Sequence, residues 1–369
     1  MRKVSVEALK PGMRVGKPLY GIDGQLYLNR GVELKPAYIK YLKKHNFNEI
    51  YVIDERMSDV EVEEVITSQT KQEALRILKD IVKDGQKDSI ARTLMLYREE
   101  LKHTVEKIMR EVLDQDSLMA NLTDISQQDY YTLNHCVNVC VLSLINGVAL
   151  DYNTKKLREL GMGAIIHDLG KMCIPHYVLN KNGSLTEDEF GLIKEHPKWG
   201  VEVLSNQFKH NSRYHVKDIV YQHHERVDGS GYPEGLTDSQ INDLAKIVSI
   251  ADVYDALISD RPYRNAFKPH EAVEMLHSTA YQYEMSHLNS FLNHVAAFPV
   301  GTMVKLNNGF LGLVIENKVG LPLRPVIRLV KTSQGEEILD DLDLSQELDL
   351  TIVDVVEEEQ EENQEHSIE

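Results

Sequence analysis

The longest regular pattern of apolar and polar positions in this chain is helical. Between residues 58 and 123, apolar residues recur at three- and four-residue steps, as at Leu101, Val105 and Ile108, with charges of both signs between them. Such spacing gathers the apolar side chains on one face of a helix. The chain stays predominantly helical over residues 124–298. We therefore predict a helical connector followed by a larger helical domain, and we prefer a connector packed on its neighbour over a signalling helix.

Two flanking segments show a β-rich pattern instead. The first, residues 1–57, contains three short β-prone stretches separated by glycines: Met13–Val15, Leu26–Leu28 and Ile50–Ile53. A short amphipathic helix is expected from Pro36 to about Lys44. The second segment, residues 299–354, is typical of short strands joined by Gly, Asn and Ser turns. The predicted fold class is mainly α, with a small β-rich module at each end.

Charge and composition limit the classes of partner. The formal net charge is −17, and residues 355–369 form a strongly acidic stretch that we predict to be disordered. Binding to DNA or RNA is not expected, because it needs a face rich in Lys and Arg. A continuous apolar run of roughly 18 residues is missing, and the first residues are too polar for a signal peptide. We therefore expect a cytoplasmic protein without a membrane segment.

Histidines and aspartates in the helical domain are the strongest candidates for chemistry. Imidazole and carboxylate donors together suit zinc, iron, manganese or nickel. Alone, each residue has a plainer interpretation, such as a hydrogen-bonded core histidine. The three cysteines, at positions 136, 140 and 173, fit core packing better than metal binding. The seven candidate metal ligands are His135, His167, Asp168, His196, His223, His224 and Asp252.

The sequence around these residues resembles the HD-GYP family of cyclic di-GMP phosphodiesterases, a branch of the HD phosphohydrolases. The resemblance runs from Asp129 to Ala266, roughly 40% of the chain, and the HH pair followed by the DGSGYP loop is its most specific part. The start LKPGMRVGKPLY is similar to a small module often found ahead of this domain. The matching motifs are, in order, YTLNH at 131–135, HDLGK at 167–171, HP at 196–197, HHE at 223–225, DGSGYP at 228–233, DVYDAL at 252–257 and RPYR at 261–264.

The resemblance implies a helical HD-type phosphohydrolase domain that hydrolyses cyclic di-GMP to linear pGpG, with further cleavage to GMP left open. Asp168 would bridge two divalent transition-metal ions, iron or manganese first and zinc or nickel as alternatives. One ion would be completed by His135, His167 and Asp252, and the other by His196, His223 and His224. A hydroxide between two such ions would attack phosphorus.

Other family positions carry further implied roles. Lys171 would stabilise the phosphate oxygens or protonate the leaving oxygen, with a structural salt bridge as its alternative. Asp255 would orient a ligand or the nucleophile. Two arginines, Arg261 and Arg264, would bind phosphate, although without the motif we would assign them to a solvated helix end.

The glycine-rich loop and one departure from the family pattern complete the prediction. The loop residues Gly231, Tyr232 and Pro233 would organise the substrate site and offer a surface to a protein partner. Some members carry a glutamate four residues before the first histidine, where it helps to hold a third metal. This chain has Tyr131 there, which argues for two metals rather than three.

Two other functional classes remain open from the sequence. One is a catalytically silent protein that binds a cyclic dinucleotide or acts as a scaffold; loss of a ligand would favour it, and none of the seven is lost. The other is an HD hydrolase of a different nucleotide, against which the DGSGYP loop argues. The sequence also leaves a homodimer open.

Overall fold

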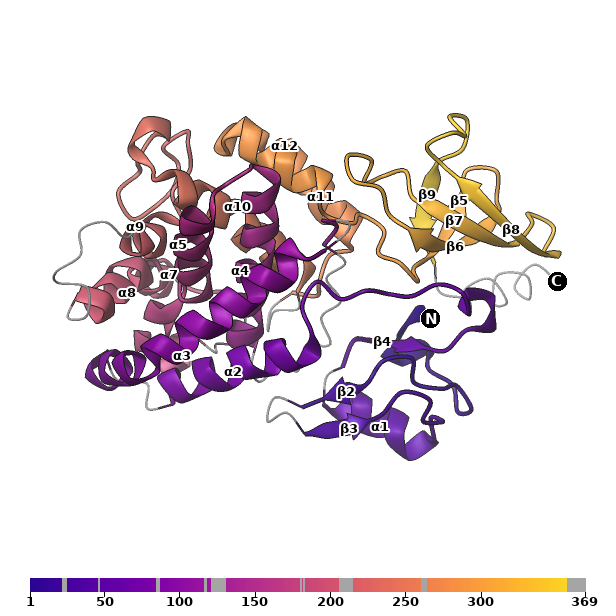
Figure 1. Ribbon diagram of the computed structural model, residues 1–369, viewed down its shortest axis with the longest axis horizontal. Helices are drawn as coiled ribbons and strands as arrows, with labels where there is room; N and C mark the ends of the chain where they lie inside the picture. Colours follow the sequence, from indigo (N-terminus) through magenta and orange to yellow (C-terminus); the bar gives the residue numbers. More distant parts are fainter. Residues whose placement is uncertain are drawn as a thin grey trace. The chain divides into compact units, whose positions relative to one another are not determined.

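The computed structural model describes two compact units (Figure 1). The helical unit comprises Val65–Ala120 and Tyr130–His294, and the β-rich unit combines Met1–Glu64 with the chain from Val295 onward. The description covers all residues except 22–24, 46, 84–86, 116–117, 121–130, 180, 182, 206–214, 260–263 and 357–369.

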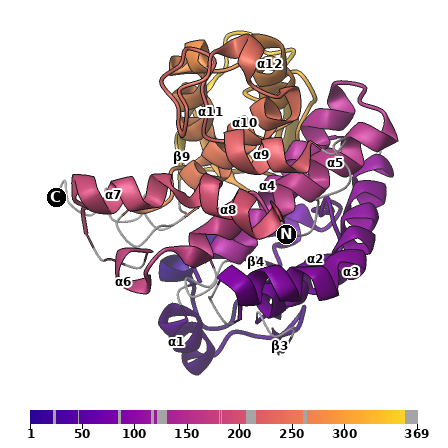
Figure 2. The same cartoon turned by 90° about the vertical axis from the view of Figure 1, so that its left-hand side faces the viewer.

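The helical unit is built around two apolar helices, α4 and α10, which pack against each other. Its helices are α2 (Ser68–Val82), α3 (Lys87–Leu113), α4 (Tyr131–Ala149), α5 (Thr154–Ile165), α6 (His176–Leu179), α7 (Glu187–Lys194), α8 (His196–Ser205), α9 (Val216–Gln222), α10 (Asp243–Ile258), α11 (Pro269–Ser278) and α12 (Met285–Asn293). Helix α4 packs against α5, α10 and α12 as well as α2 and α3. Figure 2 shows α8 and α9 side by side.

Helix α4 is buried because it carries almost no charge. Residues 133–147 are buried without interruption. In the described part of the chain, the window Thr132–Ala149 is the one stretch long and apolar enough to cross a membrane, and 83% of it is buried. Such burial is typical of a core helix, and polar residues interrupt the window, as the sequence indicated.

The start of α5 is fixed by a local cap. The Asn153 side chain accepts a hydrogen bond from the backbone N–H of Lys156 at 3.0 Å, which satisfies one of the unpaired donors at a helix N-terminus. The helix then runs to Ile165, directly before His167 and Asp168. The cap therefore fixes where the helix that leads to these two residues begins.

The β-rich unit joins the two ends of the chain. In its N-terminal part, β1 (Arg2–Ser5) pairs antiparallel with β4 (Glu49–Val52), β2 (Leu19–Tyr20) pairs with β3 (Leu26–Leu28), and α1 (Pro36–Lys44) packs beside them. The C-terminal part is a five-stranded antiparallel sheet in the order β8-β7-β6-β5-β9. Its strands are β5 (Met303–Leu306), β6 (Leu311–Glu316), β7 (Val326–Lys331), β8 (Glu337–Asp343) and β9 (Ile352–Val355).

A shared core holds these two parts together. Tyr51 and Met57 of the N-terminal part pack with Met303 and Leu313 of the sheet. The buried Tyr51 hydroxyl also donates a hydrogen bond to the Val300 carbonyl at 3.1 Å. The two β-rich modules are therefore one structural unit.

The predicted fold class is confirmed: the chain is mainly helical, with a small β region at the N-terminus and a five-stranded sheet at the C-terminus. The predicted helix at Pro36–Lys44 and the strand at Leu26–Leu28 are present. The stretch Met13–Val15 forms only isolated bridges, at Arg14 and Val15. The division into five domains, with boundaries after residues 57, 123, 298 and 354, remains a prediction.

Candidate metal centre

Close backbone packing forms the floor of the site. Asp168 is followed by a 3₁₀ turn, Leu169–Cys173, that lies against the start of α8. A Cβ atom on Gly170 would stand 1.9 Å from the carbonyl oxygen of His196. Only glycine fits there, and this close approach brings Asp168 next to His196.

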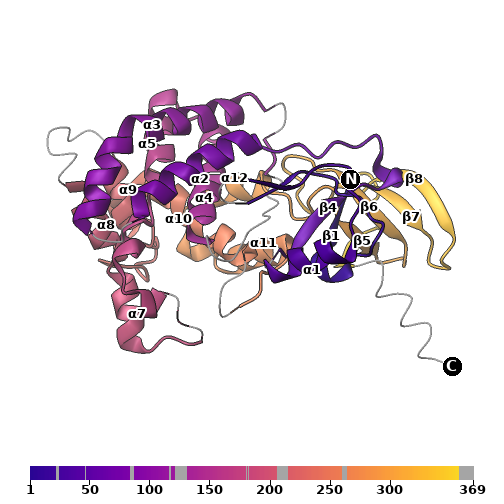
Figure 3. The ribbon, with the colours of Figure 1, turned by 90° about the horizontal axis from the view of Figure 1, so that it is seen from below.

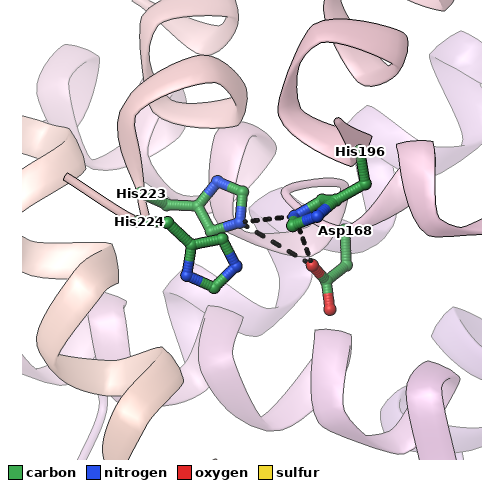
Figure 4. A group of neighbouring side chains, drawn as sticks. All are labelled: Asp168, His196, His223 and His224. Atoms are coloured by element: carbon green, nitrogen blue, oxygen red, sulfur yellow. Dashed lines mark hydrogen bonds and ion pairs between the residues drawn. The ribbon is translucent and has the colours of Figure 1, made fainter. Parts of the chain in front are cut away.

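All seven predicted ligands converge in the helical unit. Their candidate donor atoms lie within 4.8 Å of one another in each of two groups. Six of the seven side chains are buried, and His224 is 14% exposed. Figure 4 shows one group, in which the adjacent His223 and His224 face His196 and Asp168 around a common centre. The groups are Asp168, His196, His223 and His224, and His135, His167 and Asp252.

The Asp168 carboxylate lies between the two groups and presents one oxygen to each. Its Oδ1 lies 3.3 Å from Nε2 of His196 and 3.7 Å from Nε2 of His223. Its Oδ2 lies 3.6 Å from Nε2 of His135 and 3.5 Å from Nε2 of His167. A carboxylate in this position can bridge two cations.

Hydrogen bonds at the far ring nitrogen orient four of the imidazoles. Nδ1 of His167 lies 2.7 Å from the Ala164 carbonyl oxygen, and Nδ1 of His196 lies 2.7 Å from that of Ile193. Nδ1 of His223 lies 3.0 Å from the Val220 carbonyl oxygen. When Nδ1 donates to a carbonyl, Nε2 keeps its lone pair for a metal. The fourth, His135, uses a carboxylate in place of the carbonyl.

Asp255 and Asn138 support His135. Nδ1 of His135 lies 2.6 Å from Oδ2 of Asp255, and its Nε2 lies 3.0 Å from Oδ1 of Asp252. The Asn138 amide donates to the other Asp255 oxygen at 2.9 Å. The sequence analysis missed Asn138, although it follows His135 by three residues and so shares its helix face.

The electrostatics of the site favour a bound cation. Three buried carboxylates, Asp168, Asp252 and Asp255, meet there with one ammonium group, that of Lys171. Burial opposes protonation of His135, but its hydrogen bonds with Asp252 and Asp255 prevail and raise its pKa to about 9. A ring that takes up a proton so readily lies in a strongly negative field, which a divalent cation would neutralise.

Other imidazoles are held neutral. Burial lowers the pKa of His167 to about 3, against the opposing effect of Asp168, and burial also lowers the pKa of His196 and His224. Nε2 of His167 and Nε2 of His224 are buried without a hydrogen-bond partner. Neutral imidazoles with unsatisfied buried nitrogens fit a transition-metal site.

Lys171 contacts the Asp168 carboxylate directly. Its ammonium group donates to Oδ2 of Asp168 at 2.6 Å. The salt bridge that the sequence analysis weighed against a catalytic role is therefore present. The Lys171 side chain is also 19% exposed.

The predicted glycine-rich loop packs against the ligand group that contains His224. The Tyr232 ring stacks on His224, with ring centres 4.6 Å apart. A Cβ on Gly231 would stand 2.5 Å from three backbone atoms of residues 224–226, so the backbone itself fills this position. The buried Glu225 carboxylate accepts hydrogen bonds from the backbone N–H groups of Glu234 at 2.8 Å and Leu236 at 2.9 Å. The loop that ends in Pro233 is thus anchored to the residue after the His-His pair.

The structure describes only one of the two predicted phosphate-binding arginines, Arg264. The Arg264 guanidinium donates to the carbonyl oxygens of Ala256 at 2.6 Å and Leu257 at 3.1 Å, so it caps the end of α10. Arg261 lies outside the described residues, as does the side chain of Tyr131. Cys136 and Cys140 are buried core residues, and neither belongs to a ligand group.

Comparison with known proteins relates the helical unit to one family. Residues 117–286 match the HD domain model, and residues 303–364 match a KOW domain associated with HD domains. Cyclic di-GMP phosphodiesterase PA4108 of Pseudomonas aeruginosa is 36% identical over 232 residues, which are 63% of this chain and 56% of that protein. The cyclic di-GMP phosphodiesterase response regulator RpfG of Xanthomonas campestris is 34% identical over 196 residues, 48% of this chain and 51% of that protein.

A third relative has a different substrate in its name. The 3′3′-cGAMP-specific phosphodiesterase 1 of Vibrio cholerae is 34% identical over 177 residues, 48% of this chain and 39% of that protein. The chain thus spans about half the length of the curated relatives it matches.

Proposed function

We propose, on the premise that this chain is an HD-domain protein related to the HD-GYP cyclic di-GMP phosphodiesterases, that it hydrolyses cyclic di-GMP to the linear dinucleotide pGpG. The observation that carries this proposal is the position of Asp168, whose two oxygens face two separate groups of buried ligands. One carboxylate shared by two such groups is what a dinuclear hydrolase needs.

The donor set indicates the kind of metal. Five imidazoles and two carboxylates suit iron, manganese, zinc or nickel, and we propose iron or manganese. When bound, two such ions would supply Lewis-acid activation of the scissile phosphodiester and of the attacking water. The neutral imidazoles of His167, His196 and His224 hold their lone pairs ready, whereas His135 would release a proton when a metal binds.

The remaining side chains would act on the substrate or on a ligand. Lys171, with its ammonium group 2.6 Å from Asp168, would stabilise a phosphate oxygen or protonate the leaving oxygen. Asp255 would keep His135 in the orientation that directs Nε2 inward. Arg261 and Arg264 would meet the phosphates, and for Arg264 this requires release of the α10 carbonyls. The exposed part of the DGSGYP loop would offer a surface to a protein partner.

A second candidate substrate is 3′3′-cGAMP. It is favoured by the 34% identity to a Vibrio cholerae enzyme whose name specifies that substrate. The two dinucleotides differ in one base, whereas the ligands described above act on the phosphodiester. We place cyclic di-GMP first because the relatives named for it include the 36% match over 232 residues.

A direct assay tests the proposal. Purified, metal-loaded protein is incubated separately with cyclic di-GMP and 3′3′-cGAMP, and products are separated by chromatography. We expect linear pGpG from the first substrate at the higher kcat/KM.

Asp168→Ala should lower the rate by more than about a hundredfold and reduce bound metal, because it removes the bridge. Asp340→Ala, a carboxylate exposed on β8, is the matched control and should keep full activity. Absence of turnover with both substrates would favour the silent binding protein.

A further inference from the structure

A cavity lies in the helical unit, outside the metal centre. Its volume is about 410 Å³, and it lies where α3 meets α5 and the first residue of α9. Figure 3 shows α3 and α5 side by side, with α9 close by. Cavities of this size accommodate small ligands. None of the seven metal ligands lines it.

The cavity wall contains a buried carboxylate, one oxygen of which has no hydrogen-bond partner. Glu159 on α5 is 5% exposed, and its Oε1 has no hydrogen-bond partner. Burying a charged group without hydrogen bonds is costly. The unpaired oxygen of Glu159 is therefore a site for an N–H donor.

The rim of the cavity carries the opposite charge. Lys102 and Arg158 are paired with acidic neighbours, at 3.8 Å to Glu99 and 3.2 Å to Glu106. Lys155, one helical turn before Glu159, makes no ion pair within the described ranges. The cavity thus presents a buried acceptor and a cationic rim to the same ligand.

We propose that this cavity is a regulatory site for a guanine nucleotide, with Glu159 binding the base and Lys155 the phosphate. The two oxygens of a carboxylate accept from two adjacent N–H groups. Guanine has such a pair at N1 and the exocyclic amine, whereas adenine and cytosine place an acceptor beside their amine. Apolar side chains of Val105 and Met162 also line the cavity and suit a flat ring.

The position of the cavity connects it to the metal centre. Lys155 and Glu159 lie on α5, which ends directly before His167 and Asp168. Val216 begins α9, which ends directly before His223 and His224. A ligand that shifts either helix along its axis would move metal ligands at the other end. The effect on turnover rests on the proposed function, whereas binding does not.

Calorimetry with the full-length, metal-loaded chain tests the binding. The probes are guanosine monophosphate and adenosine monophosphate. We expect the guanine nucleotide to bind at least about tenfold more tightly, because adenine leaves the buried carboxylate unpaired. Glu159→Gln keeps the shape and introduces an amide donor, so it should weaken guanosine monophosphate about tenfold or more and leave adenosine monophosphate unchanged. Lys155→Ala should weaken both nucleotides.

Matched controls separate this site from the metal centre. Lys156→Ala removes a neighbouring ammonium group that lies over the Tyr152 ring at 4.2 Å and does not line the cavity; binding should be unchanged. Glu159→Gln should also keep or raise the melting temperature, since it removes a buried charge that has one unpaired oxygen. Equal binding of both nucleotides, or full binding by Glu159→Gln, overturns the proposal, because binding would then occur elsewhere.

A rate measurement tests the regulatory part. Guanosine monophosphate should change the hydrolysis rate of the wild-type chain, and the change should disappear in Glu159→Gln while the basal rate stays the same. Guanine-selective binding in a chain that hydrolyses no cyclic dinucleotide would refute the proposed function and leave the binding site standing. Selective binding with an unchanged rate in an active chain would refute regulation.

Discussion

At the scale of single residues, the environment of His135 shows how a ligand is prepared for metal. Its Nδ1 contacts Asp255 at 2.6 Å, and Asp255 is held in turn by the Asn138 amide at 2.9 Å. These contacts fix the ring orientation and leave Nε2 directed toward Asp252 and Asp168. The ring cannot rotate without breaking a buried, charge-assisted hydrogen bond.

The first prediction concerns Asp255→Asn. An amide is a weaker acceptor and can donate to the wrong ring nitrogen, so metal affinity or turnover should fall by about 10- to 100-fold. The fold should persist, because the side-chain volume is unchanged. Metal titration and steady-state kinetics measure the effect, and Asn138→Ala should give a smaller loss of the same kind. Normal metal affinity and normal turnover in Asp255→Asn would contradict the supporting role.

The seven candidate ligands can be named from the sequence because their motifs carry local signals. His167-Asp168 and His223-His224 are adjacent pairs with distinctive flanks. The contacts that support them are different. Asn138 meets Asp255 across two helices, 117 positions apart in the chain, and such tertiary hydrogen bonds leave no periodic trace in one sequence. The carbonyls that Arg264 binds lie only seven and eight positions before it, but no local pattern in the sequence indicates this contact.

At the scale of elements, the DGSGYP loop is held by backbone contacts. Gly231 packs against the backbone of residues 224–226, so its missing side chain is a structural requirement. Tyr232 follows and stacks on His224 at 4.6 Å. The loop therefore couples its own conformation to a candidate metal ligand.

The second prediction concerns Gly231→Ala. The added Cβ would stand 2.5 Å from backbone atoms that cannot move aside alone, so the loop must shift and take Tyr232 and His224 with it. Turnover should fall on the order of a hundredfold, as expected for a displacement near 1 Å at a reacting site. Gly191→Ala is the control: it lies in α7 with open space around it. It should keep activity and gain up to about 1 kcal/mol of stability. Equal activity in the two variants would contradict the packing argument.

Strands were harder to predict than helices in this chain. The helix Pro36–Lys44 was predicted from one short amphipathic stretch. In contrast, β1 was missed, and Met13–Val15 was wrong as a strand, because strand formation depends on a distant partner. Val15 meets Val52 only at an isolated bridge, whereas Arg2–Ser5 pairs with Glu49–Val52 along its length.

At the scale of the whole molecule, the two ends of the chain form one unit. The core of this unit joins Tyr51 and Met57 to Met303 and Leu313, which are separated by about 250 positions. Arg328 on β7 adds hydrogen bonds to Asp59 at 2.9 Å and to Asp341 at 2.8 Å. The sequence predicted two β-rich segments, but their joint core depends on long-range packing that local patterns do not encode.

The third prediction follows from this shared core. Removing the chain after Phe298 should expose Tyr51 and Met57 and make the N-terminal part sensitive to protease. The helical unit should keep its metal content, because all seven candidate ligands lie within it. Limited proteolysis with mass spectrometry and elemental analysis measure both effects. A chain ending at Val356, which lacks only the acidic tail, should behave like the full chain. Continued protection of residues 1–57 without the sheet would contradict the shared core.

The fourth prediction is the number of metals per chain. The described residues offer two groups of buried donors, with Asp168 between them. The position where some family members hold a third metal with glutamate is occupied by Tyr131, and a phenol is a poor ligand at neutral pH because its pKa is near 10. We therefore expect two ions per chain by elemental analysis of protein purified with excess metal. Tyr131→Glu should raise the number toward three. Three tightly bound ions in the wild-type chain would overturn this expectation.

The same two-metal arrangement predicts the order of the products. Two ions activate one phosphodiester at a time, so the first cut opens the ring and gives a linear dinucleotide with a terminal phosphate. The second phosphodiester is then no longer held in place by ring closure, and ordering a freely rotating chain costs conformational entropy. The second cut should therefore be slower, and pGpG should accumulate before GMP in a chromatographic time course. In Tyr131→Glu, a third ion would help to hold the terminal phosphate, so GMP should appear earlier than in the wild-type chain. If GMP appears from the start without a linear intermediate, both cuts must occur before release, and a two-metal centre alone would not account for the reaction.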